Sequence, residues 1–86
     1  MTSMAALKRA IQVGTVLRVV DHWQERYIGT TRTVSKTQTN GFWFEHVDGK
    51  RHWSGYGKAS QTTFHEDGSF TTDVGNGKTW TLEVIA

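Results

Sequence analysis

The pattern of apolar and polar positions predicts a chain made mostly of short β-strands. Six runs rich in β-branched and aromatic residues show this pattern, and turns containing glycine or polar residues separate them. The runs are 13–20, 27–36, 42–47, 59–65, 69–74 and 79–85. Such a series indicates an all-β domain, and closure into a small barrel would remove the exposed edges of the sheet.

The strongest local signal is Asn40-Gly41, which predicts a hairpin because both residues tolerate a positive φ. Two loop lengths fit this turn. A two-residue loop pairs Thr39 with Phe42 and places Val34 on the same face as Trp43.

The alternative is a three-residue loop over residues 39–41, with Gly41 in the left-handed conformation. It pairs Gln38 with Phe42 and leaves Trp43 pointing outward. It also gathers three apolar residues on one face, namely Val34, Phe42 and Phe44. We favour this loop because a one-residue slip in register moves every side chain to the other face, and this register buries more apolar surface.

A second hairpin is predicted at Glu66-Asp67-Gly68. Phe64 and Phe70 share a face when this loop has three residues and Gly68 is left-handed. Residues 75–78 form the last turn. The final strand then points three residues inward, namely Trp80, Leu82 and Val84.

Residues 1–12 are expected to be an extension to a single barrel domain at 13–86. Ser3 is placed to cap a short helix with Met4, Leu7 and Ile11 along one side. This segment would either cover one end of the barrel or bind a partner, and we favour the first because so short a helix is marginal on its own.

Composition narrows the class of protein. The chain has 86 residues and no cysteine, which excludes disulfides and thiolate metal sites. No run approaches the roughly 20 apolar residues of a membrane span, and no secretory signal is recognisable. We therefore expect a cytoplasmic protein. The oligomeric state does not follow from the sequence.

Charge is distributed unevenly along the chain. Residues 1–58 contain nine Lys/Arg and four Asp/Glu, a net charge of +5, whereas residues 59–86 have a net charge of −3. The total of +2 is too small to indicate nucleic-acid binding by itself. In a compact barrel the two halves interleave, so this asymmetry need not produce two faces of opposite charge.

The sequence carries no recognisable catalytic or metal-binding pattern. His46, Asp48 and His52 are near one another in the chain, but their spacing matches no standard zinc site. Ser54 lies outside any Gly-x-Ser-x-Gly motif, and the glycine-lysine turns lack the spacing of a phosphate loop. We expect no enzyme activity, no metal and no cofactor.

Aromatic and basic residues near loops and strand edges are the best candidates for binding. Trp, Tyr and Arg are enriched at the centres of protein interfaces. The candidates for a protein partner are Trp23, Trp43, Trp53, Tyr56, Arg51 and Arg32. Two or three of the chain's aromatics are needed for the core of a small barrel, and Trp80 is the clearest of these.

The first half of the domain resembles small SH3-like barrels, including KOW-type and Tudor-like modules. The resemblance rests on the run Val13-Gly14-Thr15-Val16-Leu17-Arg18-Val19-Val20, a polar loop, and Ile28-Gly29 at the start of the next strand. The chain is also similar, over most of 13–85, to small proteins of actinobacterial phages. These resemblances imply an SH3-like barrel of five or six antiparallel strands that binds a partner, such as a host protein, without catalysis.

Two other functions remain open. Nucleic-acid binding would use bases stacked on tryptophan and phosphates bound by Arg18, Arg32, Lys36, Arg51 and Lys58. Such binding would weaken steeply with salt, unlike a protein interface anchored by tryptophan. The third possibility is a structural part of a larger assembly, in which an exposed strand edge pairs with a neighbouring subunit.

Overall fold

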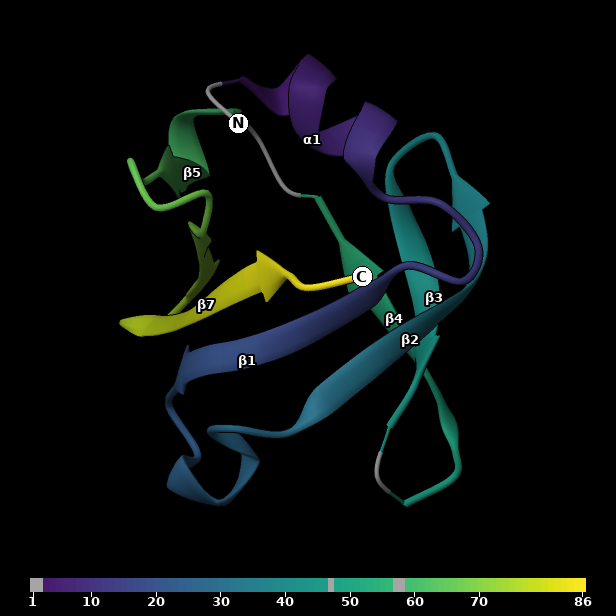
Figure 1. Ribbon diagram of the computed structural model, residues 1–86. Coiled ribbons are helices and arrows are strands. Elements are labelled where there is room, and N and C mark those ends of the chain that lie inside the picture. The colour runs from purple at the N-terminus through teal and green to yellow at the C-terminus, as the bar shows by residue number, and fades with distance from the viewer. Residues whose placement is uncertain (1–2, 47, 57–58) are drawn as a thin grey trace.

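The computed structural model describes residues 3–46, 48–56 and 59–86, except for the side chains of Ala59 and Val74. These residues form one short α-helix, two 3-10 turns and seven strands (Figure 1). The elements are α1 (Met4–Ala10), β1 (Val16–His22), η1 (Glu25–Tyr27), β2 (Thr31–Gln38), β3 (Gly41–Glu45), β4 (Arg51–Gly55), η2 (Ala59–Gln61), β5 (Thr62–Phe64), β6 (Phe70–Gly75) and β7 (Lys78–Val84).

The seven strands belong to one antiparallel sheet with the order β4-β3-β2-β1-β7-β6-β5. The sheet is strongly curved, and α1 lies across one of its open ends (Figure 1). The expectation of a mostly β chain is thus confirmed. The number of strands in the described residues exceeds the expected five or six because Arg51–Gly55 also forms a strand, and none of the six predicted runs includes these residues.

The β2–β3 hairpin differs from both sequence-based registers. Gln38 lies opposite Gly41, so the loop is Thr39-Asn40, and Gly41 does not have a positive φ. A bulge at Ser35 shifts the register within β2, between the Val34–Phe44 and Lys36–Trp43 pairs. The expected burial is nevertheless found, because the bulge restores the alternation that the shorter loop would reverse.

Gly41 is required by close packing rather than by backbone conformation. A Cβ atom there would collide with the carbonyl oxygen of Ser54 and lie 2.6 Å from Cζ2 of Trp53. Gly55, which is paired with Gly41, leaves ordinary van der Waals space beside the same indole ring. The two glycines therefore form a flat strip of backbone beneath Trp53.

The β5–β6 hairpin has the predicted geometry. Phe64 lies opposite Phe70, the amide of His65 donates to the carbonyl of Ser69, and Gly68 has a φ of 91°. The turn before β7 is also found, with Asn76 and Gly77 both at positive φ.

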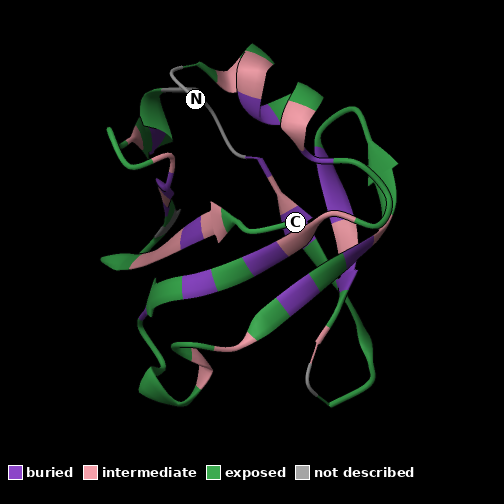
Figure 2. Ribbon diagram, viewed as in Figure 1, coloured by how far each residue is buried: buried purple, intermediate pink, exposed green. Residues whose placement is uncertain are grey.

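The core lies between the inner face of the sheet and α1. Ser3 caps this helix, because its hydroxyl accepts a hydrogen bond from the amide of Ala6. Leu7 and Ile11 are buried in the same cluster as the inner residues of β1, β2, β3, β6 and β7. Figure 2 shows the resulting alternation of buried and exposed positions along β1 and β2.

Two expectations about the last strand have different outcomes. Trp80 packs against the core as predicted. Val84, predicted to point inward, is exposed at the end of β7.

Candidate functional site

The outer faces of β3 and β4 carry an ordered row of cross-strand pairs. The pairs are Glu45–Arg51, Trp43–Trp53 and Gly41–Gly55. The alternate pairs, Phe42–Ser54 and Phe44–His52, lie on the inner face and include two buried phenylalanines. The strand alternation therefore places both tryptophans outside, where the core does not need them.

The two indole rings form one apolar surface. Their centroids are 5.4 Å apart with an angle of 57° between the rings, and Trp53 is 39% exposed to solvent. Trp43 is half-buried, and the exposed Lys36 lies opposite it on β2. Arg51 is also exposed. Cationic side chains on the neighbouring β2 and β4 positions thus border the tryptophan pair.

Trp23 lies in a different part of the molecule. It is 40% exposed, stacks on His22 at 4.0 Å between centroids, and stacks on Trp80 at 5.7 Å. The amino group of Lys78 lies 5.9 Å from its ring centroid. Trp23 is therefore not part of the surface formed by Trp43 and Trp53.

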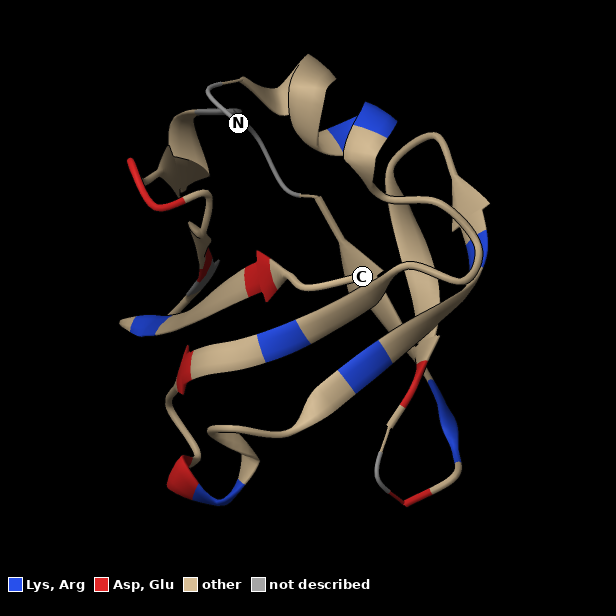
Figure 3. Cartoon of the chain, in the orientation of Figure 1, with Lys and Arg blue, Asp and Glu red and all other residues tan. Residues whose placement is uncertain are grey.

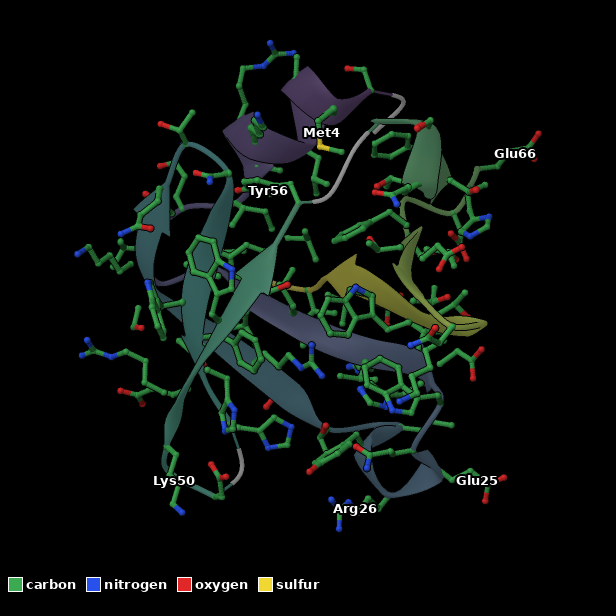
Figure 4. The ribbon with its side chains drawn as sticks, turned by 180° about the vertical axis from the view of Figure 1, so that it is seen from behind. Met4, Glu25, Arg26, Lys50, Tyr56 and Glu66 are labelled. Carbon is green, nitrogen blue, oxygen red and sulfur yellow. The ribbon has the colours of Figure 1, made fainter. Side chains whose placement is uncertain are left out.

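Two predicted partner-binding residues are buried, which corrects the expectation that they lie on the surface. Tyr56 is 6% exposed and packs against Phe42, next to α1 (Figure 4). Burial raises the pKa of its hydroxyl. Arg32 is 3% exposed on the inner face of β2. Their aromatic and aliphatic parts fill space in the core of this small domain.

Arg32 is enclosed by aromatic rings. Its guanidinium carbon lies 4.5 Å from the ring centroid of Phe44 and 5.1 Å from that of Trp80. Nε and Nη1 are buried without a hydrogen-bond partner. Burial lowers the pKa of this guanidinium to about 10.

The residues proposed for nucleic-acid binding do not form one group. Arg18 is exposed on β1 and forms an ion pair with Glu83 at 3.2 Å. Arg32 is buried, while Lys36 and Arg51 are exposed near the tryptophan pair. Lys58 lies outside the described residues. Figure 3 shows acidic and basic positions intermingled along the strands and turns.

His46, Asp48 and His52 do come close together. Nε2 of His52 lies 3.2 Å from Oδ2 of Asp48, and the rings of His46 and His52 are 5.5 Å apart. Among the residues that the structure describes, no group of three His, Cys, Asp or Glu side chains is arranged to hold a metal ion. The pKa of the Asp48 carboxyl is lowered, chiefly because it accepts a hydrogen bond from the amide of Lys50.

Sequence reasoning did not identify the cluster around Arg32. His22, Tyr27 and His46 come from β1, η1 and the turn after β3, and they join Phe44 and Trp80 through ring contacts. The signal was present, because Arg32 and Val34 have the same parity along a strand and Val34 was expected inside. The usual exposure of arginine outweighed it.

No helix in the described part of the chain is long and apolar enough to cross a membrane. Comparison of the chain with models of protein families, with curated proteins and with solved structures finds no match.

Proposed function

We propose that this protein is a non-enzymatic binding module that takes an extended segment of a partner protein on the outer face of β3 and β4. The observation that carries this proposal is the Trp43–Trp53 pair, which lies on the face opposite the core. Interfaces typically combine such an aromatic centre with a polar rim. Here Lys36, Glu45 and Arg51 supply that rim.

The position of β4 supports an extended partner. β4 is an end strand with one neighbouring strand, β3, in the described sheet. An end strand presents backbone donors and acceptors to which an extended peptide adds as a further strand. Side chains of such a peptide that point toward the outer face would contact Trp53.

The broader classification is also a proposal. We assign the curved sheet to the SH3-like barrels, on the sequence resemblance and the curvature around one core. The resemblance to actinobacterial phage proteins leads us to propose an accessory protein that acts in the host cytoplasm on a host protein. This step rests on analogy between sequences.

Nucleic-acid binding is the second candidate, since Lys36 and Arg51 border the tryptophan pair. Bases would stack on the indoles and phosphates would contact the two cations. It has less support than the first candidate, because Arg18 is ion-paired and Arg32 is buried.

A displayed library of random linear peptides tests the proposal. We expect the wild-type protein to enrich a consensus containing apolar residues, and the double variant Trp43→Ala/Trp53→Ala to lose it. Trp23→Ala is the matched control, because Trp23 is equally exposed but lies elsewhere. Enrichment of the same peptides by the double variant would refute the assignment.

Labelled single-stranded oligonucleotides, titrated at low and physiological salt, distinguish the second candidate. Binding that falls steeply with salt and depends on Trp53 and Arg51 would replace the protein partner with nucleic acid. We expect no such binding.

A further inference from the structure

The buried guanidinium of Arg32 has unused hydrogen-bonding capacity. Nε and Nη1 are both enclosed and both lack an acceptor, although buried polar groups in folded proteins are nearly always hydrogen-bonded. The faces of the group contact Phe44 and Trp80, which accept no conventional hydrogen bond. The contacts with these rings stabilise the charge but leave its N–H donors unsatisfied.

No carboxylate among the described residues forms an ion pair with this guanidinium. The ion pairs among the described residues are Arg18–Glu83 and His52–Asp48, and neither includes Arg32. Arg32 instead interacts electrostatically with His22, His46 and the phenol of Tyr27, and none of these groups is a carboxylate. A buried charge without a counter-ion destabilises the folded state, so a bound external anion would stabilise it.

The hydrogen-bonding roles of two neighbouring rings favour an acceptor ligand. The amide of Gln24 donates to Nδ1 of His22, so the neutral ring carries its hydrogen on Nε2 and can donate there. Nη2 of Arg26 donates to the hydroxyl oxygen of Tyr27, which leaves the hydroxyl hydrogen of Tyr27 available. The two rings are in contact, with centroids 5.1 Å apart.

The surroundings of the cluster carry charges of both signs, since Glu25 lies at the same end as Arg26 and Lys50 (Figure 4). Arg26 stacks on Tyr27 at 4.8 Å, and Figure 4 shows Arg26 and Lys50 at the end of the molecule opposite Met4 of α1. This end is formed by η1 and by the turn between β3 and β4, which meet where Tyr27 packs against His46 at 4.6 Å.

We propose that Arg32, His22 and Tyr27 form a binding site for a phosphate group at the end of the sheet opposite α1. Three donor groups from three different elements suit a tetrahedral oxyanion with several acceptor oxygens better than a planar carboxylate, which a single guanidinium satisfies. The described residues enclose no pocket here. The proposed site therefore opens only when half-buried side chains at this end, such as that of His46, move aside and expose the donors of Arg32.

Titration with inorganic phosphate tests the site, with chloride at equal ionic strength as the reference. We expect a saturable change in tryptophan fluorescence, because Trp80 contacts Arg32, and a rise in melting temperature. Adenosine monophosphate forms a second arm. If adenosine monophosphate binds at least 10-fold more tightly than inorganic phosphate, the phosphate group that the site binds belongs to a nucleotide whose base stacks on the exposed Trp23. Equal affinity indicates that the site binds free phosphate.

Arg32→Met should abolish the response, and Tyr27→Phe should weaken binding by about 10-fold, the loss expected for one hydrogen bond to a charged group. Arg9→Met is the matched control, because Arg9 is exposed in the last turn of α1, at the other end of the molecule. Tyr27→Phe keeps the ring and so provides the test if Arg32→Met does not fold. Equal effects of phosphate and chloride, or an undiminished response in Tyr27→Phe, would overturn the proposal.

Discussion

Replacement of Arg32 by methionine is expected to stabilise the protein. Methionine keeps most of the aliphatic volume between Phe44 and Trp80 and removes a buried charge without an anionic partner. Replacement of buried ionic groups by apolar residues of similar size is often neutral or stabilising. The prediction therefore depends on whether burial of the guanidinium charge destabilises the fold by more than its contacts with the aromatic rings stabilise it.

The magnitude follows from the environment of the guanidinium. Burial holds its pKa at about 10, well below the ordinary value for arginine, which corresponds to about 3 kcal/mol against the charged form. Loss of the contacts with Phe44 and Trp80 costs about 1 to 2 kcal/mol. The net gain in the free energy of unfolding is about 1 to 2 kcal/mol, or roughly 4 to 16 °C in melting temperature for a domain of this size.

Urea and thermal unfolding, followed by circular dichroism in a buffer free of phosphate, would measure this difference. Arg18→Met is the control, because the Arg18–Glu83 pair is exposed and such pairs contribute about 0 to 1 kcal/mol. A loss of more than about 2 kcal/mol on Arg32→Met would refute the reasoning, since it would mean that the guanidinium is well compensated inside the fold.

Three further predictions follow from the packing and from the histidines. Gly41→Ala should lower the free energy of unfolding by about 1 to 3 kcal/mol, because its methyl group would collide with a carbonyl and an indole ring. Gly55→Ala should lower it by less, as measured by unfolding in urea. Leu7→Ala should cost about 2 to 5 kcal/mol in thermal unfolding, since this side chain joins α1 to the core. Burial, and then the charge of Arg32, lower the pKa of His22 and of His46, so their contribution to stability is complete above about pH 6.5 and is lost as pH falls through the lowered pKa values. The free energy of unfolding, measured at a series of pH values, should therefore decline below pH 6.5, and this decline should be smaller in the double variant His22→Asn/His46→Asn. An equal decline in the wild-type protein and the double variant would contradict this prediction.

The positions of turns were predictable where backbone conformation alone determines them. Gly68 and the Asn76-Gly77 pair have the positive φ values that their turn types require. The Asn40-Gly41 signal gave the right hairpin but the wrong register. Gly41 is required because the indole ring of Trp53 lies over it. This contact joins β3 and β4 and cannot be predicted from the local sequence pattern.

The candidate site was only partly predictable for a similar reason. Trp43 was expected to point outward in the favoured register, and it does. Trp53 was a candidate for binding, but its position opposite Trp43 could not be predicted because no strand was expected at Arg51–Gly55. The burial of Arg32 and Tyr56 depends on how elements far apart in the chain pack together, and average preferences for exposure favoured the opposite result.

The four tryptophans allow the central claim to be tested in one spectrum. Their indole N–H groups give separate signals in a ¹⁵N-labelled sample, which single substitutions would assign. Titration with a peptide selected from the displayed library should shift the signals of Trp43 and Trp53 and leave those of Trp23 and Trp80 in place. Shifts at Trp23 and Trp80 without shifts at Trp43 and Trp53 would show that the outer face of β3 and β4 is not the binding surface.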